Sequence, residues 1–283
     1  MVTVRQKVAN YMISWGGDSL RRIFLWVQIC LSQKNPLDYR TCVRHNRLRR
    51  EANIRLEKKK VIFHVDVNSA FLSWEAVYRL HHLGGQLDLR KVASAVGGDM
   101  AMRHGIILAK SIPAKTYHIQ TGETILDARR KCPDLILVPP NYGLYETCSK
   151  AFMDILREYS PDVEQYSIDE AFMDMTGTEA LWGPPDVAAA SLRDRIRDTL
   201  GFSVNIGVSE NKLLAKMASD FKKPDRVHTL WKEEIPKKMW PLSVSDLFFC
   251  GRATTRKLFA LGIHTIGDLA HADPRMLKQH LKK

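Results

Sequence analysis

Three carboxylates lie where apolar runs of the chain end. Asp66 closes one such run, and Asp169 and Glu170 occupy the tip between two others. If these runs are neighbouring strands, the three side chains converge, and they then repel one another unless cations neutralise them. Mg²⁺ and Mn²⁺ prefer such hard oxygen ligands, and two ions together can clamp the attacking and leaving oxygens of a phosphoryl displacement. Asp is also common at strand ends and turns, so spacing alone leaves an ordinary surface turn as the alternative.

Several lysines are positioned to complement these carboxylates. Lys110 and Lys115 follow a predicted strand, and a second group surrounds the last predicted helix of this region, namely Lys212, Lys216, Lys222 and Lys223. Lysine binds phosphate as a point charge. A lysine on a helix is more often simply solvated, so both interpretations stay open.

A segment near the C-terminal end has the pattern of a helix–hairpin–helix. Gly251 at a helix N-terminus would let backbone N–H groups approach a DNA phosphate, and Arg252, Arg256 and Lys257 would add positive charge. The usual hairpin carries two glycines as G-x-G, and Phe249 stands at the first of them. A plain helical hairpin therefore explains the segment about as well.

The elements that must position these residues follow from hydrophobic periodicity. Strands are predicted at residues 61–66, 92–96, 106–109, 135–138, 163–168, 171–175 and 202–208. Helices are predicted at 69–82 with Ser69 as the cap, and at 121–130, 141–159, 184–200 and 211–220, before short helices from 243 to 281. This order predicts an α+β fold in which an antiparallel-rich sheet of the split βαβ, ferredoxin-like kind carries helices on one face.

Charge is divided unevenly along the 283 residues, whose formal net charge is +12. Residues 1–60 carry a net charge of +10, residues 61–211 a net of −6 and residues 212–283 a net of +8. An acidic middle between basic ends suits a metal site flanked by phosphate-binding surfaces, and solvated surface charge is the plainer alternative. We expect residues 1–59 to be a poorly ordered basic leader, with a nucleic-acid-binding arm as the second interpretation.

The cysteines and the hydropathy exclude two classes of protein. The five cysteines form no C-x-x-C pair, which is typical of reduced thiols in a cytoplasmic protein and not of a disulfide framework or a zinc site. No apolar run reaches the roughly 18 residues of a membrane span. We expect a cytoplasmic protein without a membrane partner.

Three blocks of sequence together resemble the Y-family DNA polymerases, the lesion-bypass enzymes of the bacterial DinB/UmuC type. The blocks are FHVDVNSAFLSWE at 63–75, YSIDEAFMD at 166–174, and NIGVSENKLLAKMASD at 205–220 with Lys223-Pro224. They occur in the family's order within a match of roughly residues 60–270. The resemblance implies a right-hand polymerase with a ferredoxin-like palm at 60–70 and 138–230, small fingers at 71–137, and a helical thumb at 231–283.

The resemblance also implies roles for particular residues. Asp66, Asp169 and Glu170 would be the catalytic carboxylates, and with the carbonyl of Val67 they would hold two Mg²⁺ ions, or Mn²⁺ in their place. Three further residues would bind the nucleotide: Phe71 as the steric gate against a ribose 2′-hydroxyl, and Lys115 and Lys223 as triphosphate contacts. The partners implied are primer–template DNA, a dNTP and, for a full-length form, a sliding clamp, and we expect a monomer.

This chain departs from the family pattern at two places. Ile112 and Lys115 stand where many members have a Tyr and, three residues on, an Arg that contact the triphosphate, so the mode of nucleotide binding is open. Family members also continue past the thumb into a little-finger domain, whereas this sequence ends at Lys283. We therefore expect an incomplete thumb without a little finger.

Two classes of function compete for this sequence. The first is a template-directed, low-fidelity DNA polymerase or its catalytic fragment, which the carboxylates favour. The second is a DNA-binding remnant that keeps the fold with little or no activity, which the missing little finger favours. A nucleotide cyclase on a palm fold is a weaker third, because the helix–hairpin–helix pattern argues against it.

Overall fold

The structure, a computed structural model, describes residues 59–98 and 105–281. The described residues form two compact units, one running to Thr229 and the second beginning at Leu230. The predicted leader falls almost wholly outside the described residues, and so does Asp99, which lies between the predicted strands at 92–96 and 106–109.

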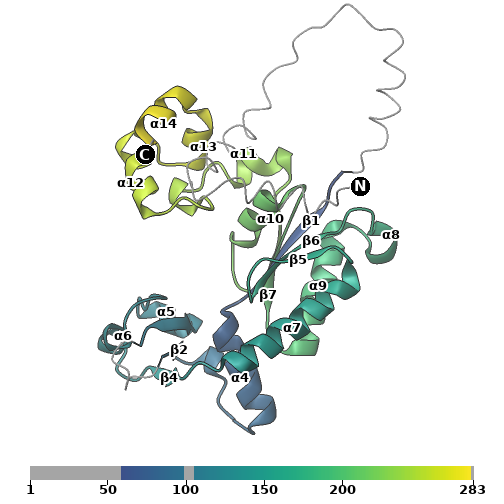
Figure 1. The fold of residues 1–283 in the computed structure, drawn as a ribbon, viewed down its shortest axis with the longest axis vertical. Helices are drawn as coiled ribbons and strands as arrows, with labels where there is room; N and C mark the ends of the chain where they lie inside the picture. The colour runs from purple at the N-terminus through teal and green to yellow at the C-terminus, as the bar shows by residue number, and fades with distance from the viewer. Residues whose placement is uncertain (1–58, 99–104, 282–283) are drawn as a thin grey trace, which may run out of the picture. The chain divides into compact units, whose positions relative to one another are not determined.

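A mixed five-stranded sheet forms the centre of the first unit (Figure 1). Its strands are β1 (Ile62–Val67), β5 (Val163–Gln165), β6 (Glu170–Asp174), β7 (Val204–Ser209) and β8 (Val227–Thr229). They lie in the order β5-β6-β1-β7-β8, with β1 antiparallel to both neighbours and β8 parallel to β7. The predicted α+β class and antiparallel-rich sheet are confirmed. Glu170, however, is not in the tip between strands as predicted, because it already pairs with Asp66 as the first residue of β6.

Helices cover both faces of this sheet, so the prediction of helices on one face is wrong. Helices α7 (Tyr142–Tyr159) and α9 (Pro185–Leu200) pack on each other, while α10 (Lys212–Ser219) packs on β1 and β7 from the other side (Figure 1). Ile62 packs with Ala215 of α10, and the alternation of a strand sends Phe63 to the opposite face. All six residues of β1 are buried because both faces are covered.

A second, smaller sheet has its own hydrophobic core. Its strands β2 (Ser94–Gly97), β3 (Ile107–Lys110) and β4 (Ile136–Val138) lie in the order β3-β2-β4. The short helices α5 (Ile112–Thr116) and α6 (Ile125–Lys131) pack on them around Ile107, Ile119 and Ile125. Helix α6 begins four residues later than predicted, because residues 122–124 pair with Ile106 and Ile107 and Thr124 then caps the helix.

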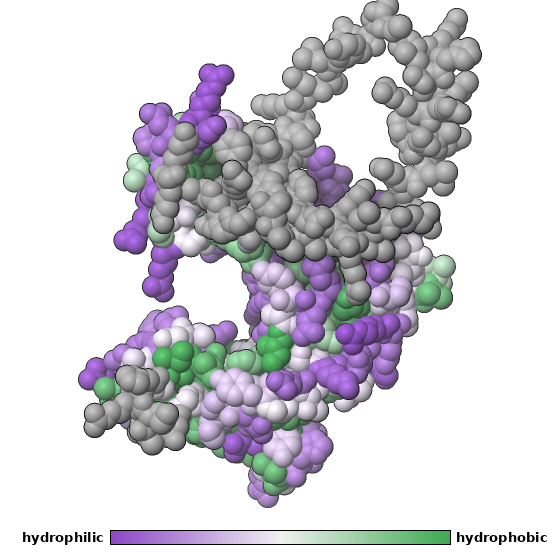
Figure 2. All heavy atoms as spheres, viewed as in Figure 1, coloured by the Kyte–Doolittle hydropathy of each residue, from purple (hydrophilic) through white to green (hydrophobic). Residues whose placement is uncertain are grey.

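Helix α4 (Ala70–His82) contacts both the small sheet and α7. Ser69 occupies the N-cap position, as predicted, but at φ 48° its side chain makes no cap hydrogen bond. The Ser73 hydroxyl instead donates to the carbonyl of Asn68 at 2.6 Å and fixes this turn. Two short elements complete the first unit, the 3-10 helix η1 (Leu89–Lys91) and α8 (Glu179–Trp182). On the face drawn in Figure 2, hydrophobic residues of this unit lie in small groups among hydrophilic ones, as expected when the apolar side chains are inside.

The second unit is helical, as predicted. Its elements are η3 (Lys232–Glu234), α11 (Ile235–Lys238), η4 (Val244–Asp246), α12 (Arg252–Ala260), α13 (Ile266–His271) and α14 (Pro274–Leu281). Val244, Leu258, Ile266 and Leu277 are buried and form its interior. Across the described residues, a search for a helix with the length and hydropathy of a membrane span finds none.

Candidate active site

Strand pairing brings two of the sequence-predicted carboxylates together. Asp66 near the end of β1 and Glu170 at the start of β6 are register partners in the antiparallel ladder. Opposite residues of such a pair lie about 5 Å apart, with side chains on the same face. Two carboxylates on adjacent central strands would repel strongly, so their proximity requires a cation nearby.

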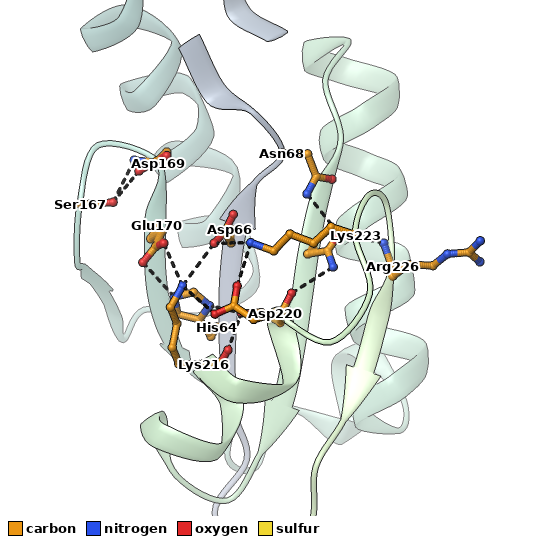
Figure 3. A network of polar contacts seen from close by, with 12 residues as sticks. His64, Asp66, Asn68, Ser167, Asp169, Glu170, Lys216, Asp220, Lys223 and Arg226 are labelled. Carbon is orange, nitrogen blue, oxygen red and sulfur yellow. Dashed lines mark hydrogen bonds and ion pairs between the residues drawn. The ribbon is translucent and has the colours of Figure 1, made fainter. Parts of the chain in front are cut away.

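The cation between them is Lys216 (Figure 3). Its ammonium Nζ lies 2.9 Å from Oε1 of Glu170 and 3.3 Å from Oδ2 of Asp66, and its side chain is only 8% exposed. Asp220, one turn further along the chain, contributes a third carboxylate at 3.5 Å. Helix α10 therefore presents Lys216 to the sheet as a buried counter-charge, in contrast to the solvated lysine that its sequence also allowed.

Lys223 is a second cation on the same aspartate. Its Nζ lies 3.0 Å from Oδ2 of Asp66 and 2.9 Å from Oδ1 of Asp220, with about a third of the side chain exposed. Asp66 is thus contacted by two lysines that both follow β7 in the sequence. Sequence reasoning named Lys223 as a site residue and left Lys216 among the surrounding lysines.

Burial and these charges perturb the pKa values of the cluster. Burial raises the pKa of Asp66 to about 6, against the opposing charges of Lys223 and Lys216. Burial alone would also raise the pKa of Glu170, but the adjacent His64 ring and the charge of Lys216 outweigh it and hold that pKa well below its usual range. Burial disfavours the charged form of Lys216, yet the surrounding carboxylates raise its pKa above the ordinary value.

His64 supports Glu170 from within the sheet. The ring is fully buried, its Nε2 lies 3.4 Å from Oε2 of Glu170, and its Nδ1 lies 2.8 Å from the hydroxyl of Ser219. Burial lowers the pKa of His64. Sequence reasoning missed this residue, and the available signal was a histidine at an inward position of an otherwise apolar strand.

Asp169 reaches the same cavity from a different direction. Its carboxylate accepts a 2.7 Å hydrogen bond from the Ser167 hydroxyl, and its backbone carbonyl accepts one from the N–H of Val67 at 3.0 Å. This backbone bond ties the end of β1 to the turn before β6. Within the described ranges no group of three potential metal-ligating side chains is close enough to hold an ion in this arrangement.

One cavity of about 340 Å³ nevertheless collects most of the predicted site. Asp66, Val67, Asp169 and Glu170 line it from the large sheet, and Phe71 lines it from α4. Lys110 lines it from β3, Lys115 from α5 and Thr121 from the loop before α6. Lys223 and Ile112 are not among the lining residues, and the Ile112 side chain is 52% exposed.

The ring of Phe71 is fixed by the aromatic residues behind it. It stacks on Tyr145 with centroids 4.5 Å apart and planes 9° from parallel, and it also contacts Trp74. The hydroxyl of the buried Tyr145 donates to Glu75 at 3.1 Å, which prevents the tyrosine from turning away. Phe71 therefore presents a fixed edge to the cavity.

A buried asparagine anchors the loop that carries Lys223. Asn205 donates from Nδ2 to the carbonyls of Ser219 and Lys222 at 3.1 and 2.8 Å. Its Oδ1 accepts from Asn68 Nδ2 at 3.2 Å and from the N–H of Arg226 at 3.3 Å. All four hydrogen-bonding positions of the amide are thus used. The sequence marked Asn205 only as part of a family block.

The predicted DNA-binding residues lie together in the second unit. Gly251 is the N-cap of α12, which carries Arg252, Arg256 and Lys257. Arg252 and Arg256 line a cavity of about 530 Å³ with Cys250 and Thr255. Phe249, at the position of the missing glycine, adopts φ 69°, a backbone conformation that favours glycine.

The oxygen donors around this cavity are of the chemical kind that divalent magnesium or manganese prefers, but no three ligating side chains of the described residues lie close enough here to bind one ion. The donors are three carboxylates and a backbone carbonyl around one cavity, all hard oxygen ligands. Asp66 and Glu170 already share a single positive charge, so they lie close enough to act on one cation.

The chain was compared with known proteins. A family model described as the impB/mucB/samB family matches residues 65–220. A protein of Clostridium acetobutylicum named DNA polymerase IV is 52% identical over 224 residues, which cover 79% of this chain and 56% of that protein. DNA polymerase IV 1 of Bacillus subtilis is 41% identical over 224 residues, 79% of this chain and 52% of that protein. The chain thus spans about half the length of these curated relatives.

Solved structures share the fold. The crystal structure of DinB from Sulfolobus solfataricus superposes with a TM-score of 0.66 at 24% identity, over 79% of this chain and 63% of that one. An insertion ternary complex of Dbh DNA polymerase gives a TM-score of 0.68 at 24% identity, over 79% and 64% of the two chains. At this identity the similarity establishes a common mixed α+β architecture.

Proposed function

The chain belongs to the impB/mucB/samB family, and from that membership we propose that it is the catalytic part of a template-directed DNA polymerase of the lesion-bypass type. The reaction is transfer of a dNMP to the 3′-hydroxyl of a primer. The observation that carries the proposal is the single cavity lined by Asp66, Asp169 and Glu170 on one side and by Lys110 and Lys115 on the other. An acidic wall facing a basic one suits a triphosphate bound with its cations.

Each wall has a distinct task in this reaction. Asp66, Asp169, Glu170 and the carbonyl of Val67 would hold two Mg²⁺ ions, which supply activation of the primer hydroxyl and neutralise the triphosphate. Lys115 would bind the triphosphate from the fingers, and Lys223 from the loop that Asn205 anchors. Phe71 would lie against the sugar and exclude a 2′-hydroxyl, because its ring is held by Tyr145.

The two sheets and the helical unit suit the parts of a right hand. The large sheet, with its split βαβ order, would be the ferredoxin-like palm at 60–70 and 138–230. The small sheet has a core of its own, which supports fingers at 71–137. The second unit begins at Leu230, which supports a thumb from residue 231. Gly251, Arg252, Arg256 and Lys257 would contact the phosphates of primer–template DNA from this unit.

Primer extension with Mg²⁺ and a labelled primer–template tests the proposal. The wild-type chain should add dNMPs, and Asp169→Ala should abolish addition. Asp154→Ala is the matched control, because that carboxylate is exposed on α7, where it pairs with Arg157. Template binding without any incorporation, where DNA polymerase IV of Clostridium acetobutylicum extends the same primer, would refute the proposal and leave the DNA-binding remnant.

The remaining expectations concern location and partners. A cytoplasmic location, a monomeric state and a sliding-clamp partner for a longer form stay predictions of the sequence.

A further inference from the structure

Lys110 lines the same cavity as Lys115, one of the two predicted triphosphate ligands, and hydrogen bonds hold the strand that carries it. It is the last residue of β3 and pairs with Ala95 of β2. Ile107 is buried in the core of the small sheet, so the alternation of the strand directs Leu108 and Lys110 to the opposite face, where both line the cavity.

Hydrogen bonds of the next residue hold the end of this strand. The N–H of Ser111 donates to the carbonyl of Ser94 at 2.9 Å, and its hydroxyl donates to the carbonyl of Val92 at 2.7 Å. The same hydroxyl accepts from the N–H of Ser94 at 3.1 Å. The backbone that carries Lys110 is therefore fixed before any ligand arrives, which lowers the entropic cost of binding.

Among the described residues Lys110 forms no ion pair, although the charge of Glu123 is near enough to act against the lowering of its pKa. Its ammonium makes one hydrogen bond, a 3.4 Å contact with the hydroxyl of Thr121, which also lines the cavity. Burial and then the nearby charge of Lys115 lower the pKa of Lys110. By contrast, Lys131 at the end of α6, which packs on the same small sheet, pairs with Glu123 at 2.5 Å. Two cations that repel each other beside a cavity are stabilised when an anion binds between them.

The side chain at position 112 cannot supply a phosphate contact from the small sheet. Many members of the resembled family have a triphosphate-binding Tyr there, whereas this chain has Ile112, which is exposed and does not line the cavity. An isoleucine also has no hydrogen to donate to a phosphate. The small sheet therefore needs a second phosphate donor, in addition to Lys115, if it is to bind a triphosphate.

We propose that Lys110 is a nucleotide-binding residue that, with Lys115, contacts the triphosphate of the incoming nucleotide from the small sheet. This inference rests on the proposed function. It assigns the second phosphate contact to Lys110, at the end of β3, in place of residue 112. Lysine acts here as a point charge, and its fixed strand position compensates for the missing planar arginine.

The first test is steady-state primer extension by Lys110→Ala. We expect KM for the dNTP to rise about 10- to 100-fold, the range for losing one charge-assisted contact, with kcat changed less than about threefold. Lys110→Arg should keep KM within about threefold of wild type because it preserves the charge. Lys91→Ala, which removes an exposed lysine of the same region, is the matched control and should leave KM unchanged.

The second test measures binding without catalysis. Inorganic tripolyphosphate is titrated calorimetrically into the wild-type, Lys110→Ala and Lys91→Ala proteins, and only Lys110→Ala should lose about tenfold or more in affinity. A wild-type chain that extends no primer but loses tripolyphosphate binding in Lys110→Ala would refute the polymerase and support the anion site. Equal tripolyphosphate affinity, or an unchanged KM in an active Lys110→Ala protein, would overturn the inference.

Discussion

Lys216→Met removes the buried cation of the candidate site while keeping the length and apolar stem of the side chain. The ammonium lies within 3.5 Å of carboxylate oxygens of Asp66, Glu170 and Asp220. Breaking one partner out of a buried ion pair costs about 3–5 kcal/mol, because the remaining charge stays buried and unpaired. Lys223 remains 3.0 Å from Asp66, and Glu170 and Asp220 are 19% and 43% exposed. We therefore expect the lower end, about 3 kcal/mol at pH 7.5.

The loss should depend on pH in a defined direction. Asp66 has a pKa of about 6, above its ordinary value, so its protonated form stabilises the fold and this contribution is lost as pH rises through 6. Glu170 has a lowered pKa, so its contribution is present above its ordinary pKa and is lost as pH falls. Without Lys216 the pKa values of both carboxyl groups rise, so both groups become protonated and neutral at a higher pH than in the wild type. The difference between variant and wild type should therefore shrink from pH 7.5 to pH 5.

Urea unfolding followed by tryptophan fluorescence, without divalent cations, measures both effects. Lys216→Arg should recover part of the loss because it restores the charge. Lys212→Met on the same helix is the control, since its partly exposed pair with Glu164 should contribute about 1 kcal/mol or less. A Lys216→Met protein as stable as wild type at pH 7.5, or a difference that stays constant down to pH 5, would refute the reasoning.

Two further predictions follow from the aromatic residues. Phe71→Ala should raise incorporation of ribonucleotides relative to deoxyribonucleotides about 10- to 100-fold, because the fixed ring no longer excludes the 2′-hydroxyl. Competition between the two nucleotides in primer extension measures this ratio. An unchanged ratio would exclude Phe71 as the steric gate. Phe249→Gly should be more stable than Phe249→Ala by about 1 kcal/mol, because both variants lack the ring and φ 69° strains alanine. Thermal unfolding of the two proteins measures this difference. A Phe249→Ala protein that is as stable as Phe249→Gly, or more stable, would contradict the prediction.

Much of the fold follows from local patterns. The periodicity of residues 141–159 and 184–200 predicts α7 and α9 to within a residue, because a long amphipathic helix leaves a strong signal. Helix α6 begins late because residues 122–124 pair with Ile106 and Ile107 instead. That pairing joins segments more than a dozen residues apart, and a local pattern contains no information about it.

The sequence by itself determined the family, the α+β class and the positions of Asp66, Asp169 and Glu170 at the ends of strands. Tertiary structure alone decided which charges those carboxylates meet. Periodicity indicates that α10 has a buried face, but only its packing against β1 and β7 makes Lys216 the counter-ion of Asp66 and Glu170. In the same way, only the cavity distinguishes Lys110 from the exposed Ile112 two residues later. Burial and charge pairing depend on neighbours that are distant in the sequence, so they are properties of the folded chain.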